Sequence, residues 1–186
     1  MKGYKNKLFA SILAIAMLFV FSSCEEDDNW YRGDLTFSTS NDKYSPVTDR
    51  RGEFDITVDF YDTDITGYDS RWNNLREFKI YNSWLSVFNK TSFREGDEID
   101  IYIEAKGVGT YETTLRMDRK GYGEVAGNYD SALLDFMYEV VGRLLYNGSA
   151  RLRISGKVFD KNGRPVQQEL PFDITLENSL DLRISN

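Results

Sequence analysis

Residues 54–60 read Phe-Asp-Ile-Thr-Val-Asp-Phe (FDITVDF), with an apolar side chain at every second position. Successive side chains of a β-strand point to opposite faces of its sheet, so this alternation predicts a strand with one buried and one solvated face. The same period of two recurs in residues 99–104, 151–158 and 172–176. Repeated strands of this kind predict a fold that is mainly β.

Less regular alternation predicts further strands at 35–39, 76–81, 84–88, 111–117 and 180–185. Two glycine-containing turns, at 106–109 (KGVG) and 161–164 (KNGR), supply the positive φ that hairpins need. One-sided strands joined by short hairpins favour antiparallel pairing. We therefore predict an antiparallel β-sandwich, immunoglobulin-like or similar.

One segment breaks the period of two and has helical spacing instead. Between residues 130 and 146, one helical face collects the apolar side chains of Leu133, Leu134, Phe136, Met137, Val140, Val141, Leu144 and Leu145. Asp130 or Ser131 provides an N-cap, and Asn147-Gly148 provides a left-handed end. The prediction is one amphipathic helix packed on the sandwich. There are two alternatives. One is a strand through residues 140–142, and the other is a helix that binds a partner or a membrane surface.

The composition excludes several classes of function. The chain has 23 Lys and Arg, 30 Asp and Glu, one cysteine and no histidine. Nucleic acid requires clustered positive charge, so we expect no nucleic-acid partner. Without histidine, Ser-His-Asp and Cys-His nucleophiles and histidine zinc sites are excluded. With a single cysteine the chain forms no internal disulfide, so its stability must come from packing.

The N-terminus has the parts of an export signal. Lys2, Lys5 and Lys7 precede Leu8–Phe21, a run of 14 uncharged apolar residues. As a helix this run would be about 21 Å long, too short for a hydrocarbon core of about 30 Å. A signal segment therefore fits better than a permanent membrane anchor. Small residues, Ser22 and Ser23, then lead directly to the single cysteine, Cys24.

This leader resembles the signal of bacterial lipoproteins, with Phe21 in place of the usual leucine. The resemblance implies cleavage after residue 23 and a lipid, such as palmitate, on Cys24. The acidic run at 25–28 (EEDD) is similar to the export signal of Bacteroidetes lipoproteins, which implies the outer membrane and its external face. The alternatives are a secretory signal with an incidental cysteine, and an acidic run that serves only as an extended tether.

These boundaries divide the chain into a signal peptide (1–23), a lipidated acidic tether (24–33) and one β-rich globular domain (34–186). Without the leader, 163 residues remain, enough for one domain with a substantial core. Loss of the three leader lysines leaves 20 basic and 30 acidic residues, a formal net charge of −10.

Four aspartates form a candidate calcium site, and calcium is the one cofactor that the sequence suggests. Asp59, Asp62, Asp64 and Asp69 lie in one short segment. Calcium binds about six to eight oxygen ligands, which carboxylates provide. The spacing is not that of an EF-hand and the closing glutamate is missing. The alternative interpretation is an acidic loop that serves solubility.

Trp72, with Arg71, Asn73 and Asn74 beside it, is a candidate glycan-stacking site. An exposed aromatic face stacks on a sugar ring, and the polar neighbours can hydrogen-bond its hydroxyls. The alternative is that aromatic residues are present in this chain for packing, since they favour strands and cores.

Two other short motifs are compatible with chemistry. Glu98 with Asp100 or Glu104 would supply the two acids of a glycoside hydrolase, although alternating acids also mark a solvated strand face. Residues 130–132 (DSA) resemble the acceptor motif for O-glycosylation in Bacteroidetes envelope proteins, which makes Ser131 a candidate modification site.

Residues 154–166 (ISGKVFDKNGRPV) resemble the opening hairpin of the carboxypeptidase-regulatory-like β-sandwich found in many Bacteroidetes envelope proteins. That family continues for several more strands, whereas 20 residues follow here. The resemblance implies a β-sandwich and no particular activity.

The sequence thus predicts a lipid-anchored envelope protein that binds or assembles rather than catalyses, accessory to surface glycan capture or adhesion. Its partner would be a glycan or another envelope protein. The alternatives are a small carboxylate-based glycan hydrolase and a structural stalk or pilus-type component. A hydrolase requires two convergent acids in a pocket, a binding module an exposed aromatic or apolar surface, and a stalk an open edge strand.

Overall fold

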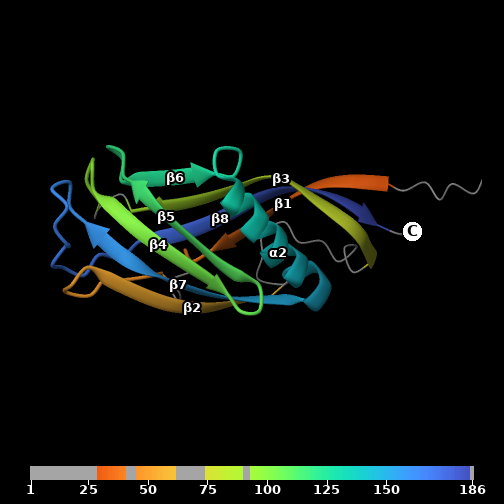
Figure 1. Ribbon diagram of the computed structural model, residues 1–186, viewed down its shortest axis with the longest axis horizontal. Coiled ribbons are helices and arrows are strands. Elements are labelled where there is room, and N and C mark those ends of the chain that lie inside the picture. Colours follow the sequence, from red (N-terminus) through yellow and green to blue (C-terminus); the bar gives the residue numbers. More distant parts are fainter. Residues whose placement is uncertain (1–28, 41–44, 62–73, 90–92, 185–186) are drawn as a thin grey trace, which may run out of the picture.

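Strands account for most of the residues that the structure describes. The computed structural model describes residues 29–40, 45–61, 74–89 and 93–184. Their elements are β1 (Asn29–Ser38), β2 (Glu53–Tyr61), β3 (Leu75–Phe88), β4 (Glu98–Ala105), β5 (Gly109–Arg116), β6 (Tyr122–Ala126), α2 (Ser131–Asn147), β7 (Ser149–Phe159) and β8 (Asp173–Ile184) (Figure 1).

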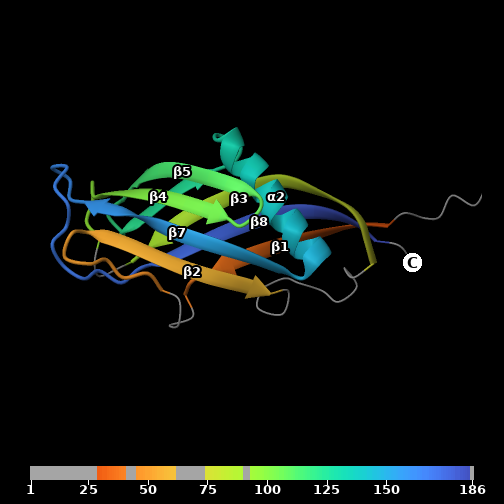
Figure 2. The same cartoon turned by 60° about the horizontal axis from the view of Figure 1, so that its bottom comes forward.

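The strands form two four-stranded sheets with the orders β1-β8-β3-β6 and β2-β7-β4-β5, and every pairing is antiparallel. The pairs are nested, because β1 lies beside β8, β2 beside β7, β3 beside β6 and β4 beside β5. This is the strand order of a jelly roll. The predicted antiparallel β-sandwich is confirmed, and Figures 1 and 2 show its two sheets facing each other.

The alternating segments bury the side chains that their period predicts. Phe54, Val58 and Phe60 of β2 are buried, and the same holds for Ile99, Ile101 and Ile103 of β4. Aromatic rings bridge the sheets, since Phe37 of β1 meets Phe60 of β2 edge-on with 5.2 Å between ring centroids. Burial of this apolar surface is the main force that holds the sheets together.

Two pairs of predicted strands are single long strands in the structure. Residues 76–81 and 84–88 both belong to β3, and residues 172–176 and 180–185 fall largely within β8. The apolar alternation along each strand is interrupted at Ser83 and at Asn178. Both are polar residues at inward-facing positions, where they are buried. The hydroxyl of Ser83 donates to Asn178 Oδ1 at 2.8 Å, which satisfies both groups inside the core.

The globular domain begins earlier than the predicted boundary at residue 34. Residues 29–33, which the sequence analysis places in the tether, belong to β1 and pair with β8, starting with Asn29 opposite Ile184. Residues 29–33 are therefore part of the sandwich and not of a tether. An acidic, extended run does not predict this pairing, because the strand depends on its partner near the other end of the chain.

The predicted helix is confirmed as α2, which connects β6 of one sheet to β7 of the other. Asp130 is the N-cap, and its carboxylate accepts hydrogen bonds from the backbone N–H groups of Ala132 and Leu133. Gly148 ends the helix in the left-handed conformation with φ 72°. The helix runs unbroken through residues 140–142, which excludes the alternative strand there, and most of its apolar stripe is buried. No helix within the described ranges is both long and apolar enough to cross a membrane.

The start of α2 is tied to β5 by a tyrosine. The hydroxyl of Tyr111 donates to Asp130 Oδ2 at 2.8 Å, and its ring stacks with Phe136 at 6.0 Å between centroids. Burial, followed by this hydrogen bond, raises the pKa of Tyr111 well above its ordinary value. The N-cap is therefore fixed to the sandwich as well as to its own helix.

The lowered pKa values of two aspartates in turns indicate how the stability of the domain depends on pH. The pKa of Asp49 is lowered by the N–H groups of Glu53 and Arg51, and that of Asp160 by the N–H of Arg164. A lowered pKa in the folded state adds stability that is present above the ordinary value of 3.8 and is lost as pH falls below it. Because the chain has no histidine, we expect the free energy of unfolding to be flat between about pH 6 and 8.

Urea denaturation at pH 7 and pH 3 checks this expectation. Asparagine keeps the acceptor oxygen but does not titrate, so the variant Asp49→Asn with Asp160→Asn should lose less stability on acidification than the native chain does. An equal loss in both proteins would show that these two carboxylates do not set the acid response.

Candidate functional site

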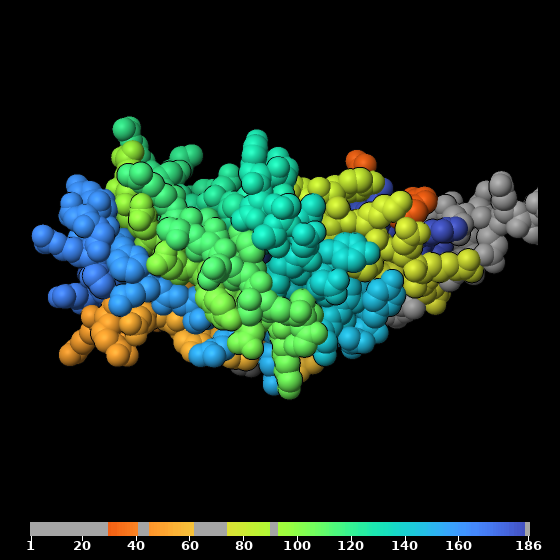
Figure 3. All heavy atoms as spheres, in the orientation of Figure 1, coloured from red at the N-terminus to blue at the C-terminus, as the bar shows by residue number. Residues whose placement is uncertain are grey.

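A hollow lined by aromatic and polar side chains runs along the exposed side of α2, between β3 and the β4–β5 turn. We call it the aromatic cleft. It has a volume of about 340 Å³ and is lined by Phe78, Gly107, Val108, Tyr138, Glu139, Gly142, Arg143, Tyr146 and Asn147. Figure 3 shows this face, with atoms of α2 (teal) between those of β3 (yellow) and the β4–β5 hairpin (green).

Helical periodicity places the aromatic wall of the cleft. Tyr138, Gly142 and Tyr146 are four residues apart, so they form one line along α2, outside its buried apolar stripe. Phe78 of β3 is buried beneath this line. Its ring stacks on Tyr138 at 4.6 Å between centroids and lies tilted against Tyr146 at 6.1 Å. The two tyrosines remain 46% and 59% exposed.

Gly142 makes this arrangement of rings possible. A Cβ at this position would lie 3.1 Å from Phe78 Cζ, closer than most real Cβ contacts. With glycine there, the Phe78 ring reaches the helix surface between the two tyrosines. The aromatic wall is therefore a packed unit and not three independent side chains.

Polar side chains form the opposite wall of the cleft. Glu139, Arg143 and Asn147 are again four residues apart, beside the turn that contains Gly107. The guanidinium of Arg143 lies against that turn, with Nη1 donating to the Gly107 carbonyl at 3.5 Å. A Cβ on residue 107 would be 2.9 Å from the same nitrogen. Gly107 thus provides both a turn with φ 75° and the space that the arginine occupies.

The cleft combines apolar ring faces with planar hydrogen-bonding groups. Such a surface can stack on the C–H face of a sugar ring while guanidinium, carboxylate and amide groups hydrogen-bond its hydroxyls. Among the described residues of its lining, Glu139 alone carries a carboxylate. Glycoside hydrolysis ordinarily uses two. The groups described here are those that a sugar-binding surface uses.

Most of the predicted glycan and calcium residues lie outside the part of the chain that the structure describes. These are Arg71, Trp72, Asn73, Asp62, Asp64 and Asp69, and Cys24 lies outside it as well. Asn74 is described, and it is exposed directly before β3, away from the cleft lining. Within the described residues, no group of three or more Asp, Glu, Cys or His side chains is placed to hold a metal ion.

Asp59, the described member of the predicted calcium site, is held by an arginine. Its carboxylate accepts hydrogen bonds from Arg151 Nε and Nη2 at 2.5 and 2.7 Å. The pKa of Asp59 is lowered first by this hydrogen bonding and further by the nearby charge of Lys106. Two cations beside the carboxylate disfavour a divalent metal ion, so Asp59 is not placed as a calcium ligand.

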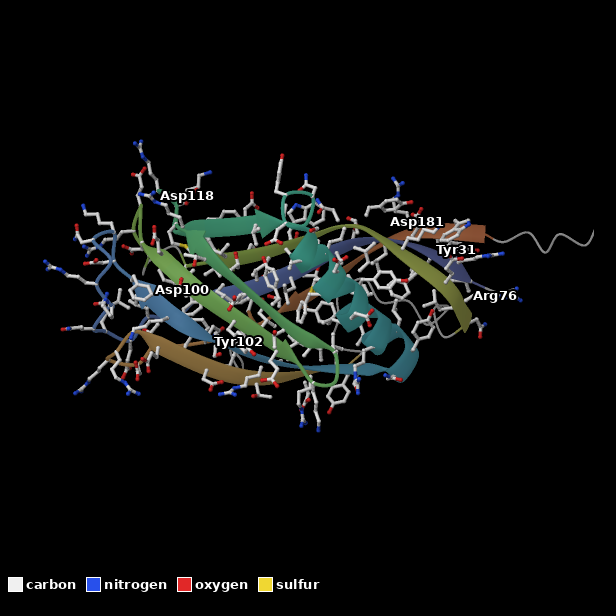
Figure 4. All side chains as sticks on the ribbon, viewed as in Figure 1. Tyr31, Arg76, Asp100, Tyr102, Asp118 and Asp181 are labelled. Atoms are coloured by element: carbon white, nitrogen blue, oxygen red, sulfur yellow. The ribbon has the colours of Figure 1, made fainter. Side chains whose placement is uncertain are left out.

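The predicted carboxylate pairs lie on the open outer face of β4. A shallow hollow there has a volume of about 390 Å³ and contains Asp100 with Glu112 of β5, and not with Glu98 or Glu104. Asp100 accepts a hydrogen bond from the Thr114 hydroxyl at 2.6 Å. Figure 4 shows Asp100 and Tyr102 together on this strand. The register of β4 and β5, which the sequence pattern did not specify, places Thr114 opposite Asp100 and Glu112 opposite Tyr102.

Ser131 is the first residue of α2 and is exposed, next to the N-cap Asp130. Its modification stays a prediction.

The sequence analysis missed Tyr138, Arg143 and Tyr146, although a signal for them was present. The polar side of the same helix carries tyrosines and polar residues at four-residue spacing, and only its apolar side was interpreted.

No protein-family model and no curated protein sequence matches this chain. Among solved structures, this chain is similar to a chain of the Cocksfoot mottle virus structure. The two share 8% identity with a TM-score of 0.43, and the match covers 84% of this chain and 85% of the virus chain. A mud crab tombus-like virus structure has 6% identity, a TM-score of 0.38, and coverage of 91% and 98%. We draw nothing about function from likenesses at this level.

Proposed function

We propose that this protein is a lipid-anchored, non-catalytic module of the cell envelope that binds glycans in the aromatic cleft on α2. The observation that carries the proposal is the pair of exposed tyrosines, Tyr138 and Tyr146, held by the buried ring of Phe78 beside Arg143. Tyrosine offers a large contact surface at a small cost in side-chain entropy. Packing against Phe78 reduces that cost further.

The dimensions of the cleft favour a short oligosaccharide. Tyr138 and Tyr146 are eight residues apart, which is about 12 Å along a helix axis. The volume of about 340 Å³ lies within the range of small-ligand pockets. A chain of linked sugars could contact both rings at once, whereas a single sugar ring would reach only one of them.

The proposed anchor would hold the domain close to the bilayer. Five residue steps separate Cys24 from Asn29, where β1 begins. A fully extended chain of that length spans at most about 18 Å. A lipid on Cys24 would therefore keep the sandwich beside the membrane. The basic and apolar leader, Cys24 and the acidic run support this part of the proposal.

Replacing Tyr138 with alanine is expected to weaken glycan binding by about tenfold or more, because an aromatic contact and its apolar area are lost. The measurement is a screen of the soluble mature chain, carrying Cys24→Ser, against immobilised host and plant glycans. We expect binding to be unchanged by EDTA, since the described residues of the cleft form no carboxylate cluster. Loss with EDTA would favour calcium bound at Asp62, Asp64 and Asp69.

Tyr129→Ala is the matched control. Tyr129 is 89% exposed and does not line the cleft, so its removal should leave binding unchanged. Thermal denaturation of both variants would show whether Tyr138→Ala remains folded, because Tyr138 packs on Phe78. If the folded Tyr138→Ala variant binds as well as Tyr129→Ala, the cleft is not the glycan site.

A further inference from the structure

A second hollow adjoins the aromatic cleft, and Arg143 lines both. We call it the basic hollow. It has a volume of about 300 Å³ and is lined by Asp59, Tyr61, Lys106, Arg143, Ser149 and Arg151. These residues come from β2, β7, α2 and the turn after β4. A ligand in the cleft therefore has access to a second group of side chains next to the arginine.

The charges around the basic hollow leave two cations in excess. Three of its lining residues are basic, although the chain as a whole has a formal net charge of −7. Arg151 is neutralised by its bidentate pair with Asp59. Lys106 and Arg143 form no ion pair with any carboxylate of the described residues. The guanidinium of Arg143 instead donates to a backbone carbonyl at 3.5 Å, which uses one of its five donors.

Lys106 and Arg143 are each held in place by a hydrogen bond. The N–H of Lys106 donates to the Arg151 carbonyl at 3.2 Å, which holds the start of the turn against β7. Arg143 is held on α2 and against Gly107, as described above. The hydroxyls of Tyr61 and Ser149 add uncharged donors to the same hollow. Together these groups present hydrogen-bond donors from several sides, which is what an oxyanion requires.

We propose that the site selects acidic glycans, with a sugar ring on Tyr138 and Tyr146 and its carboxylate or sulfate ester in the basic hollow, against Arg143 and Lys106. This inference rests on the proposed glycan binding and adds the class of ligand. A neutral sugar leaves both cations to water. An acidic sugar gains charge-assisted hydrogen bonds, including the bidentate geometry that a guanidinium forms with an oxyanion.

Titration calorimetry with matched ligands tests this selection on the soluble mature chain. One pair is tetragalacturonate and its carboxyl-reduced neutral counterpart, and the other is a sulfated carrageenan oligosaccharide and its desulfated form. We expect the acidic member to bind at least about tenfold more tightly at low salt, and the advantage to shrink as salt rises. The pair with the larger advantage identifies carboxylate or sulfate as the preferred anion.

Arg143→Met and Lys106→Met should reduce binding of the acidic member to the level of the neutral one. Arg164→Met and Lys120→Met are matched controls at exposed residues that line neither hollow, and they should not change binding. The acidic selection would be overturned if both members of each pair bind equally and Arg143→Met has no effect on either. Glycan binding in the cleft would still stand if Tyr138→Ala then loses binding of both members.

If no oligosaccharide binds, glycan binding itself is wrong, and inorganic sulfate then tests the basic hollow alone. Backbone NMR shifts confined to Gly107, Arg143 and Ser149 during a sulfate titration would keep the anion site. An absence of shifts at those residues would overturn it as well.

Discussion

Gly156→Ala is expected to destabilise the domain by about 3 kcal/mol or more, and to prevent folding if the sheet cannot adjust. Gly156 lies in the middle of β7, between Phe54 of β2 and Ile101 of β4. A Cβ there would lie 1.9 Å from the carbonyl oxygen of Asp100 and 2.8 Å from Phe54 Cζ. The oxygen belongs to the paired backbone of β4, so it cannot move without disturbing the β4–β7 pairing.

Urea denaturation of residues 24–186, carrying Cys24→Ser, measures this loss, with Gly109→Ala as the matched control. Gly109 is the first residue of β5, and a Cβ there would meet no atom within 4 Å. We expect that substitution to change the free energy of unfolding by less than about 1 kcal/mol. Similar midpoints for the two variants would contradict the close approach of β7 and β4 at Gly156.

Cys24→Ala is expected to abolish lipid attachment completely, because the modification that the leader implies requires a thiol and the chain has no other cysteine. The measurement is incorporation of labelled palmitate into the full chain in cells, together with its recovery in the membrane fraction. The control is Ser22→Ala, which keeps Cys24 and a small residue before it. Label that still enters the Cys24→Ala variant would show that the proposed anchor is wrong.

Local patterns predicted the class of fold because they depend on neighbours in sequence. The alternation in residues 54–60 predicts both a strand and its buried face, and Phe54, Val58 and Phe60 are buried as expected. The helix was equally predictable, since its cap at Asp130 and its end at Gly148 involve residues within one turn of each terminus.

Long-range contacts explain where the sequence analysis was wrong. It divided β3 and β8 into two strands each, because Ser83 and Asn178 interrupt the apolar alternation. These residues are 95 positions apart and hydrogen-bond each other in the core, so neither is an unsatisfied polar group. The start of β1 at Asn29 was missed for a similar reason, since that residue pairs with Ile184.

In the aromatic cleft, too, residues close in sequence were predictable and residues distant in sequence were not. Tyr138, Gly142 and Tyr146 share a helix face, which their spacing alone would predict. Phe78 and Gly107, which complete the cleft, come from β3 and from the turn after β4. No local pattern relates these two residues to α2.

The sequence by itself determined a mainly β chain with one capped helix, an acidic composition without histidine, and a leader that resembles a lipoprotein signal. The strands, the helix and the leader follow from residues that are adjacent or within one or two turns of each other, and the composition follows from a count over the chain. Only the tertiary structure decided the jelly-roll strand order, the partner of Asp100 and the meeting of Phe78, Gly107 and Arg143 around the cleft. These depend on which distant segments bury their apolar faces together, and such contacts leave no periodic trace along the chain.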